Sequence, residues 1–586
     1  MSAPLLSIRD LAVQYRTPRG LVDAVRSVSF DVEPGQVTAI VGESGSGKTT
    51  VAQSVIGLLA SNGQIAGGSV VLNERRVGPT ELVGLSERRW RGLRGRCIGL
   101  IPQDPGNSLN PVGTIGGSIG ESLRIHGMRD RTQRRARVLE LLEQVGIDQP
   151  EARAKQYPHE FSGGMRQRVL IAAAIANNPE LIIADEPTSA LDVTVQRTVL
   201  DLLDRLRQET GTGVLFITHD LAVAAERAEN VVVMRGGEVQ ESGPSERVLS
   251  RPESEYTRQL MRDAPAFGDG PKRERIAVGS GTGIGTATGT EDFAEFSEPV
   301  ADAAVDAAGG AAPAGGALAA EPATTAPLVT VAHLRQEFRT GRSSEPFVAV
   351  DDVSFVVPRG STHALVGESG SGKTTTGRAI AGFATPTSGS IRVDGTEVTE
   401  LRGAALREFR KTTQLVYQNP YGSLDPRQTI AQALAEPLRN FGIGSRGDRA
   451  DRVHRALELV ALPAEFAHRR PRELSGGQRQ RVAIARALIV EPELVVLDEA
   501  VSALDVTVQA QILRLLVSLQ QELGLSYVFI SHDLAVVRQI ADTVSVLQRG
   551  RQVEHGPTEQ VFSDAQHPYT RQLIEAIPGR TPDWVI

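Results

Sequence analysis

An eight-residue segment occurs twice in this chain of 586 residues, without a difference between its copies. Residues 42–49 and residues 367–374 both read Gly-Glu-Ser-Gly-Ser-Gly-Lys-Thr. Both fit the pattern G-x-x-x-x-G-K-[ST], in which backbone N–H groups surround phosphate oxygens, the lysine reaches the outer phosphates and the hydroxyl holds Mg²⁺. The two copies predict two nucleotide sites, because a chance glycine-rich loop would not recur letter for letter.

The sequence around each loop fits a strand followed by a helix. Residues 37–41 and 363–366 are apolar and predict strands, while residues 50–59 and 375–383 predict helices that open at the lysine. A helix N-terminus adds partial positive charge to a phosphate site. We therefore expect nucleotide contacts from Gly42, Glu43, Ser44, Gly45, Ser46, Gly47, Lys48, Thr49 and Thr50, and from Gly367, Glu368, Ser369, Gly370, Ser371, Gly372, Lys373, Thr374 and Thr375.

The repetition extends over most of the chain. Positions 162 to 219 align with positions 475 to 532 without a gap, so the chain contains a duplicated domain rather than a short repeat unit. We predict a first domain over residues 1–262 and a second over residues 328–586. Between them, residues 263–327 are predicted to form a disordered, acidic, Gly/Ala-rich linker.

Composition excludes several classes of site and partner. The net charge of −7 gives no overall basic field that would attract nucleic acid. The single cysteine, Cys97, excludes an intramolecular disulfide and any zinc or iron–sulfur site built from several cysteines of this chain. No run reaches the roughly 18 to 20 strongly apolar residues of a membrane helix, so we expect any membrane association to come through partner chains.

Each copy also ends a buried strand with two acids. Residues 181–186 read Leu-Ile-Ile-Ala-Asp-Glu, and residues 494–499 read Leu-Val-Val-Leu-Asp-Glu. Asp185 and Asp498 are placed to hold the water shell of Mg²⁺, and the following glutamates, Glu186 and Glu499, to orient or deprotonate an attacking water. The alternative, acids that merely end a strand, does not account for their pairing with two phosphate loops.

A third motif lies between the loop and the acidic strand of each copy. Residues 161–168 read Phe-Ser-Gly-Gly-Met-Arg-Gln-Arg, and residues 474–481 read Leu-Ser-Gly-Gly-Gln-Arg-Gln-Arg. With the loops and the acidic strands, this signature resembles that of ATP-binding cassette ATPases over both copies. The resemblance implies an α/β fold of two P-loop NTPase domains, each with a RecA-like core, an antiparallel β subdomain and a helical subdomain.

The family resemblance also assigns residues position by position. It implies that each signature faces the ATP bound on the opposite copy, through Ser162, Gly163, Gly164, Ser475, Gly476, Gly477 and Gln478. His219 and His532 resemble the switch histidine that contacts the γ-phosphate. Gln103 and Gln418 resemble the glutamine that touches Mg²⁺, so the expected metal set is Thr49, Gln103, Asp185, Thr374, Gln418 and Asp498. Tyr15 and Phe338 are candidates for stacking on adenine.

Three segments narrow the branch of the family. Residues 104–111 and 419–426 look like the peptide and nickel importer group, and so does the C-terminal segment 567–573, of which a remnant stands at 255–260. Some members of this group carry a cysteine cluster in the extension, and this chain has none. We therefore expect neither an iron–sulfur cluster nor zinc. The phosphate loops and the acidic strands predict ATP and Mg²⁺ as the cofactors.

The resemblance predicts an ATPase that energises uptake of oligopeptides or dipeptides. Its partners would be two integral-membrane permease subunits and a solute-binding protein, at the cytoplasmic face of the cell membrane, with no nucleic acid. Nickel, glutathione or a peptide-like antibiotic stay open as solutes. The alternatives are a soluble tandem cassette ATPase acting on the ribosome, which usually has a charged helical linker, a DNA-repair cassette ATPase, which needs cysteine-based zinc modules, and an exporter, which is typically fused to membrane helices.

Overall fold

The structure is a computed structural model that describes residues 3–18, 20–74, 78–189, 191–264, 326–339, 346–418, 420–502 and 504–578. Both copies of the repeat belong to one compact unit, residues 1–271 with residues 327–586. The predicted linker, residues 263–327, lies outside the described residues from 265 to 325.

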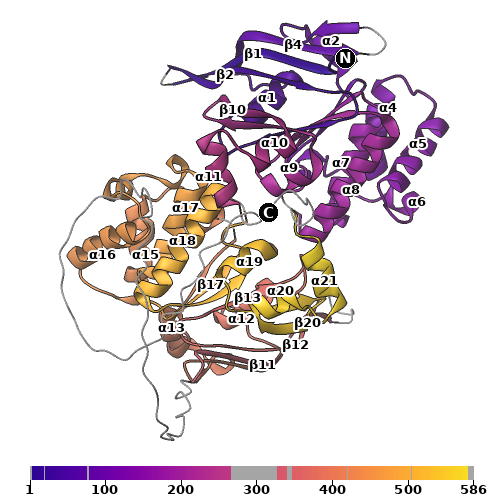
Figure 1. The fold of residues 1–586 in the computed structure, drawn as a ribbon. Coiled ribbons are helices and arrows are strands. Elements are labelled where there is room, and N and C mark those ends of the chain that lie inside the picture. The colour runs from indigo at the N-terminus through magenta and orange to yellow at the C-terminus, as the bar shows by residue number, and fades with distance from the viewer. Residues whose placement is uncertain are drawn as a thin grey trace, which may run out of the picture. The chain divides into compact units, whose positions relative to one another are not determined.

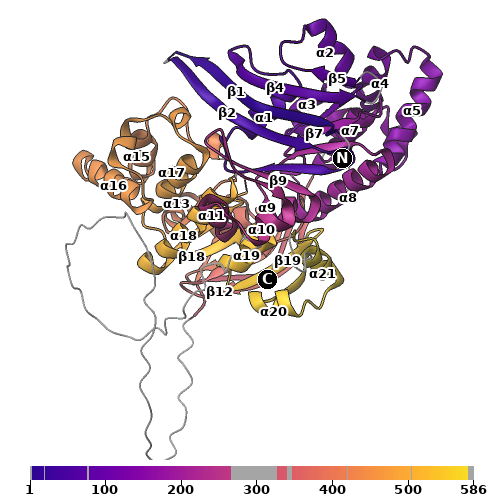
Figure 2. The ribbon, with the colours of Figure 1, turned by 45° about the horizontal axis from the view of Figure 1, so that its top comes forward.

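Each copy begins with a four-stranded antiparallel sheet. The strand order is β2-β1-β4-β5 in the first copy and β12-β11-β14-β15 in the second, so the repeat in sequence is a repeat in topology. Figure 2 shows β1, β2 and β4 side by side. The strands are β1 (Leu6–Thr17), β2 (Gly20–Val32), β4 (Gly63–Glu74), β5 (Gly78–Glu81), β11 (Val329–Phe338), β12 (Phe347–Val357), β14 (Ser388–Val393) and β15 (Thr396–Glu397).

A six-stranded sheet forms the core of each copy, in the order β10-β9-β3-β8-β7-β6 and its equivalent β20-β19-β13-β18-β17-β16. All its pairings are parallel except that of the edge strand β10 or β20. Every residue of β3, β7 and β8 is buried, as expected for parallel strands covered on both faces. The strands are β3 (Val37–Val41), β6 (Ile98–Ile101), β7 (Leu181–Asp185), β8 (Gly213–Ile217), β9 (Asn230–Arg235), β10 (Glu238–Pro244), β13 (Thr362–Val366), β16 (Thr413–Val416), β17 (Leu494–Asp498), β18 (Ser526–Ile530), β19 (Thr543–Gln548) and β20 (Arg551–Pro557).

Helices surround the core sheet and build a separate helical subdomain in each copy. In the first copy the subdomain packs α4, α5 and α7 against one another (Figure 1). The first copy has α1 (Lys48–Val55), α2 (Glu87–Leu93), α3 (Pro105–Ser108), α4 (Ile115–Ile125), α5 (Arg131–Gln144), α6 (Pro150–Arg153), α7 (Gly163–Ile175), α8 (Val193–Thr210), α9 (Leu221–Arg227), α10 (Ser245–Ser250) and α11 (Glu255–Asp263). The second has α12 (Lys373–Ile380), α13 (Gly403–Thr412), α14 (Pro420–Ser423), α15 (Ile430–Phe441), α16 (Arg446–Leu459), α17 (Gly476–Leu488), α18 (Val506–Leu523), α19 (Leu534–Ile540), α20 (Thr558–Ser563) and α21 (Pro568–Glu575).

The helices after the phosphate loops open at the lysines, as predicted, but end earlier than the sequence pattern indicates. α1 stops at Val55 and α12 at Ile380, whereas the pattern extends to residues 59 and 383. The reason is Gly57, which has a φ of +65°, and its counterpart Gly382, with +69°. Left-handed glycines end helices. None of the helices in the described parts of the chain combines the length and apolarity of a membrane span.

The signature helix α7 approaches α8 so closely that one glycine is required. A Cβ atom built on Gly164 would lie 2.4 Å from Val195 Cγ1, and one built on Gly477 would lie 2.3 Å from Val508 Cγ1. A Cβ on the preceding residue, Gly163, would lie 3.8 Å from its nearest neighbour, which is ordinary contact. The two adjacent glycines of the signature therefore meet different steric constraints.

This difference predicts unequal effects of one substitution at neighbouring positions. Gly164→Ala should lower the free energy of unfolding by about 1 to 3 kcal/mol, because the new methyl group overpacks the α7–α8 contact. Gly163→Ala is the matched control and should change it by less than about 0.5 kcal/mol. Urea unfolding followed by circular dichroism measures both, and equal stability of the two variants would contradict the close approach.

A histidine is buried in the core sheet of the second copy only. His363 in β13 has no exposed surface, and its position in the first copy holds Thr38. Its ring stacks on Phe355 at a centroid distance of 4.2 Å. Its two nitrogens lie 2.8 Å from Thr543 Oγ1 and 3.1 Å from Ser545 Oγ. Burial, with a smaller contribution from the nearby charge of His555, lowers the pKa of His363 to about 3.

The lowered pKa predicts that the second copy loses stability in mild acid. The unfolded chain takes up a proton at this histidine near pH 6.5, whereas the folded chain does so only near pH 3. The contribution of His363 to the free energy of unfolding is therefore fully present above pH 6.5. It falls as the pH decreases, by about 2 kcal/mol between pH 7 and pH 5. In His363→Thr, which installs the residue of the first copy, the difference in unfolding free energy between these pH values should shrink by that amount. If the substitution left the pH dependence of the unfolding free energy unchanged, the lowered pKa of His363 would be contradicted.

Candidate nucleotide-binding sites

The first phosphate loop connects β3 to α1, and its glycines are fixed by close packing. Gly42 has a φ of +147°, and a Cβ atom there would lie 2.1 Å from the carbonyl oxygen of Met234. Gly367 repeats this with a φ of +146° and a distance of 2.1 Å to the carbonyl oxygen of Leu547. Gly47 and Gly372 precede the helices in the left-handed conformation. Only glycine fits where the loop folds against the sheet.

The loop lysines are buried and bonded to their own loops. Lys48 Nζ donates to the carbonyl oxygens of Gly42, at 2.6 Å, and Glu43, at 2.8 Å. Lys373 makes the equivalent bonds at 2.7 and 2.8 Å. Burial lowers the pKa of both ammonium groups, and nearby carboxylates, Glu186 foremost for Lys48, counteract it in part. The loop thus forms a cradle around a partly desolvated positive charge.

Two buried hydroxyl groups in these loops have no hydrogen-bond partner among the described residues. They are Ser46 Oγ and Ser371 Oγ, and each serine is 3% exposed. A buried hydroxyl without a partner is costly, and a bound anion would satisfy it. These orphaned donors, the lysines and the helix N-termini together fit a phosphate group.

The aspartate that ends β7 or β17 lies beside the threonine that follows the loop lysine. Thr49 Oγ1 lies 3.2 Å from Asp185 Oδ1, and Thr374 Oγ1 lies 2.8 Å from Asp498 Oδ1. Burial and the charge of Glu186 raise the pKa of Asp185 to about 6, although Thr49 and Lys48 counteract them. Burial likewise raises the pKa of Asp498. A hydroxyl and a buried carboxylate form a hard oxygen donor pair, which fits Mg²⁺.

The glutamate after each aspartate lies between a histidine and a glutamine. Glu186 Oε2 accepts from Gln103 Nε2 at 2.9 Å, and Glu186 Oε1 lies 3.3 Å from His219 Nδ1. In the second copy Glu499 Oε2 lies 2.7 Å from Gln418 Nε2 and 3.4 Å from His532 Nδ1. The structure therefore brings these three side chains together in both copies.

Electrostatics and backbone geometry single out both glutamates. Burial alone would raise the pKa of each, but the hydrogen bond and charge of the neighbouring histidine bring it below its usual value. Burial alone would lower the pKa of each histidine, and the glutamate raises it above the usual value instead. Glu186 and Glu499 also have left-handed backbones, with φ of +46° and +48°.

Each signature serine caps the helix that follows it. Ser162 Oγ accepts from the backbone N–H of Met165, and Ser475 Oγ accepts from that of Gln478, both at 3.3 Å. In the second copy Gln478 Oε1 also accepts from the N–H of Ser475 at 3.0 Å, which completes a capping box. The Gln478 side chain thus bonds to the N-terminal end of its own helix, α17. Met165 has no side-chain oxygen and cannot make the equivalent bond.

A pocket at the second phosphate loop takes residues from both copies. Phe338 and Phe347 line it with Lys373 and the loop, and the first copy contributes Ser189, Leu191 and Asp192. Of the described residues of the first signature, Ser162, Gly163 and Gly164 are not among those that line it. Ser189, Leu191 and Asp192, which follow the acidic strand β7, therefore border the second phosphate loop in this structure. In the first copy the ring of Tyr15 packs against Gly63 of β4.

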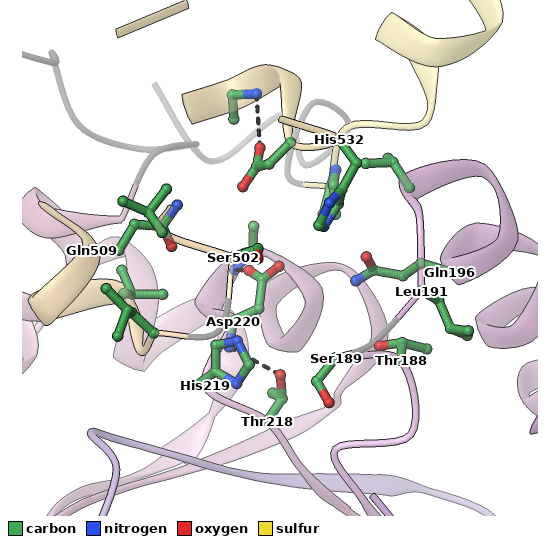
Figure 3. A pocket seen from close by; sticks show the side chains of 18 of the residues that line it. Thr188, Ser189, Leu191, Gln196, Thr218, His219, Asp220, Ser502, Gln509 and His532 are labelled. Atoms are coloured by element: carbon green, nitrogen blue, oxygen red, sulfur yellow. Dashed lines mark hydrogen bonds between the residues drawn. The ribbon is translucent and has the colours of Figure 1, made fainter. Parts of the chain in front are cut away.

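A second pocket joins the two histidines (Figure 3). His219 and His532 both line it, together with Ser189 and Ser502 of the loops that follow the acidic strands. Figure 3 also shows Gln196 of α8 and Gln509 of α18 at its wall. The histidines of the two copies thus border one shared cavity.

Sequence reasoning missed one pair of contacts at the loops. The N–H of Glu43 donates to Tyr256 Oη at 3.2 Å, and the N–H of Glu368 donates to Tyr569 Oη at 3.1 Å. Both tyrosines belong to the Tyr-Thr-Arg-Gln-Leu segment that both copies carry after the core sheet. That repeat was the available signal, but nothing in it points to a contact with a loop some 200 residues earlier.

Two family models match parts of the chain. Residues 25–189 and 350–502 match the model of the ABC transporter family. Residues 553–585 match the model described as "Oligopeptide/dipeptide transporter, C-terminal region".

Relatives extend over nearly the whole chain. The oligopeptide transport ATP-binding protein OppD of Mycobacterium tuberculosis is 43% identical over 615 residues, which cover 99% of this chain and 99% of that protein. Glutathione import ATP-binding proteins GsiA of Pectobacterium atrosepticum and Escherichia coli are 42% and 41% identical, and each comparison covers 99% of this chain and 90% of that protein. Since the family model matches more than half of the chain and such relatives cover nearly all of it, the chain belongs to the ABC transporter family, with two ATP-binding cassettes in tandem.

Proposed function

We propose that this chain is the ATP-hydrolysing subunit of an importer that takes up oligopeptides or dipeptides through separate permease subunits. The observation that carries the proposal is the complete set of lysine, threonine, aspartate, glutamate, histidine and glutamine side chains, gathered twice at the ends of parallel strands. The match of residues 553–585 to the oligopeptide/dipeptide transporter region supports the solute class.

In the proposed mechanism the phosphate loops bind ATP. Lys48, Ser46 and the N-terminus of α1 would hold the phosphates at the first site, and Lys373, Ser371 and α12 at the second. Thr49 with Asp185, and Thr374 with Asp498, would hold Mg²⁺, which neutralises charge on the phosphates. Gln103 and Gln418 stand beside these pairs through their bonds to the glutamates.

The glutamates would act on the attacking water. Glu186 and Glu499 have pKa values below the usual range, so they are carboxylates at neutral pH and can accept a proton from water or orient it. His219 and His532 hold these carboxylates from the other side. Because both copies carry the set, we propose that both sites hydrolyse ATP.

Coupling to transport would depend on contacts between the cassettes. Asp192 borders the second phosphate loop, and the charge of Asp505 acts on Lys48 of the first. Each nucleotide site therefore lies next to a loop of the other cassette. We propose that ATP binding brings the signature helices, α7 and α17, onto the opposite site and that hydrolysis releases them, which drives permeases at the cytoplasmic face of the membrane.

The two-site proposal predicts that either glutamate is needed for full turnover. Glu186→Gln and Glu499→Gln keep the shape but remove the base, so each single variant should hydrolyse ATP at half the wild-type rate or less. The double variant should lose about 100-fold or more. Phosphate release measures the rate, and Glu491→Gln, an exposed carboxylate on the surface, is the matched control. Full activity in either single variant would refute two hydrolytic sites.

The solute and the partners are testable by purification. The tagged chain, extracted from membranes with mild detergent, should copurify with two permease subunits, and ATP-dependent uptake of labelled oligopeptides should stop in the double glutamine variant. The GsiA relatives favour glutathione, itself a short peptide, as a second candidate solute, and competition between the two solutes decides between them. Recovery with ribosomal RNA and without permeases would overturn the importer.

A further inference from the structure

Each copy has a C-terminal extension after its core sheet, which contains α11 in the first copy and α21 in the second. The extension contacts the phosphate loop of the same copy at one peptide group. In the first copy this group joins Gly42 to Glu43. Its carbonyl oxygen accepts from Lys48 Nζ at 2.6 Å, and its N–H donates to Tyr256 Oη at 3.2 Å. The lysine and the tyrosine thus hold opposite ends of one peptide plane, and rotation of that plane would break both bonds.

The second copy repeats this arrangement. The peptide group between Gly367 and Glu368 accepts from Lys373 Nζ at 2.7 Å and donates to Tyr569 Oη at 3.1 Å. Both tyrosines are almost fully buried, with 5% and 4% of their surface exposed. A tyrosine hydroxyl accepts from the same N–H in both copies, and this points to a role for the hydroxyl beyond filling space with an aromatic ring.

Each extension helix is anchored to its own cassette where it begins. Both carboxylate oxygens of Glu241 in β10 accept from backbone N–H groups, those of Glu253 at 3.0 Å and Ser254 at 3.1 Å, directly before α11. Glu554 in β20 does the same at 2.7 and 3.1 Å before α21. Bidentate acceptance from two successive N–H groups fixes the direction of the helix, and with it the tyrosine on its first turn.

The other end of each extension helix contacts the opposite cassette. Asp263 at the end of α11 pairs with Arg514 of α18 at 3.0 Å, and its side chain is 6% exposed. The carbonyl oxygen of Glu575, at the end of α21, accepts from Arg197 of α8 at 2.7 Å. α8 and α18 are the helices capped by Asp192 and Asp505, next to the opposite phosphate loops.

We propose that each extension is a strut for the phosphate loop of its own cassette, in which Tyr256 and Tyr569 are positioning residues for the loop lysines. A donor on the carbonyl polarises the peptide group and strengthens its N–H as a donor, so the tyrosine and lysine bonds support each other. Without the hydroxyl, the peptide plane turns more freely and the lysine loses its fixed direction. The inference rests on the proposed nucleotide sites.

Phenylalanine substitutions test the strut at one site at a time. Tyr256→Phe is made in a Lys373→Ala background, which leaves the first loop as the site that is read, and Tyr569→Phe is made in a Lys48→Ala background. Titration with a fluorescent ATP analogue and Mg²⁺ should show affinity about three- to tenfold weaker than in the parent background, the value of one hydrogen bond. The thermal midpoint of unfolding is measured in parallel.

A third tyrosine supplies the matched control. Tyr527 is 1% exposed and its hydroxyl donates to the carbonyl oxygen of Leu516 at 3.0 Å, away from either loop. Tyr527→Phe removes the same group, so it should lower the thermal midpoint and leave nucleotide affinity unchanged. If Tyr256→Phe and Tyr569→Phe behaved in this way too, the strut would be overturned while the nucleotide sites stood. If the parent backgrounds bound no nucleotide, the sites and the strut would both be overturned.

Discussion

The parallel pairing of β3 with β8 and β9 determines where the chemistry of the first cassette lies, and β13 with β18 and β19 does the same in the second. Parallel strands end at the same edge of a sheet, and ligands of α/β proteins bind there. The phosphate loop follows β3, Asp185 ends β7, and His219 follows β8 within two residues. These strands are only five residues long, so a slip of one residue would move the whole set of side chains apart.

Much of this could be predicted because the signals are local. The phosphate loop, the acidic strand end and the serine before α7 are each contiguous in sequence, and each carries its own geometric requirement. The bond from the N–H of Glu43 to Tyr256 joins residues 213 positions apart, and no local pattern encodes such a pairing. The early end of α1 at Gly57 was missed because apolar periodicity continues beyond the residue that stops the helix. The contact of Gln478 with nucleotide stays a prediction from the family pattern, and that pattern does not indicate its bond to the N–H of Ser475.

The two cassettes share a topology but differ in the groups that support their sites. Gln478 completes a capping box where Met165 has no side-chain acceptor. Arg235 lies 4.8 Å from the centre of the Tyr256 ring, and the position that corresponds to it in the second copy holds Gln548. The first extension contacts the opposite cassette through the ion pair of Asp263 with Arg514. The second does so through the backbone carbonyl of Glu575, which accepts from Arg197. The duplicated cassettes have therefore kept the loop lysine, threonine, aspartate, glutamate and histidine of each site and differ in the groups that support them.

The left-handed backbone at Glu186 and Glu499 has a consequence for directed evolution. A residue with a side chain pays about 1 to 2 kcal/mol for this conformation, and glycine does not. Because the N–H of Glu186 is bonded to the carbonyl oxygen of Ile217 at 2.9 Å, the strand next to it prevents the backbone from relaxing. A library screened only for heat resistance would therefore enrich glycine or asparagine at these two positions, and the most heat-resistant clones would be inactive.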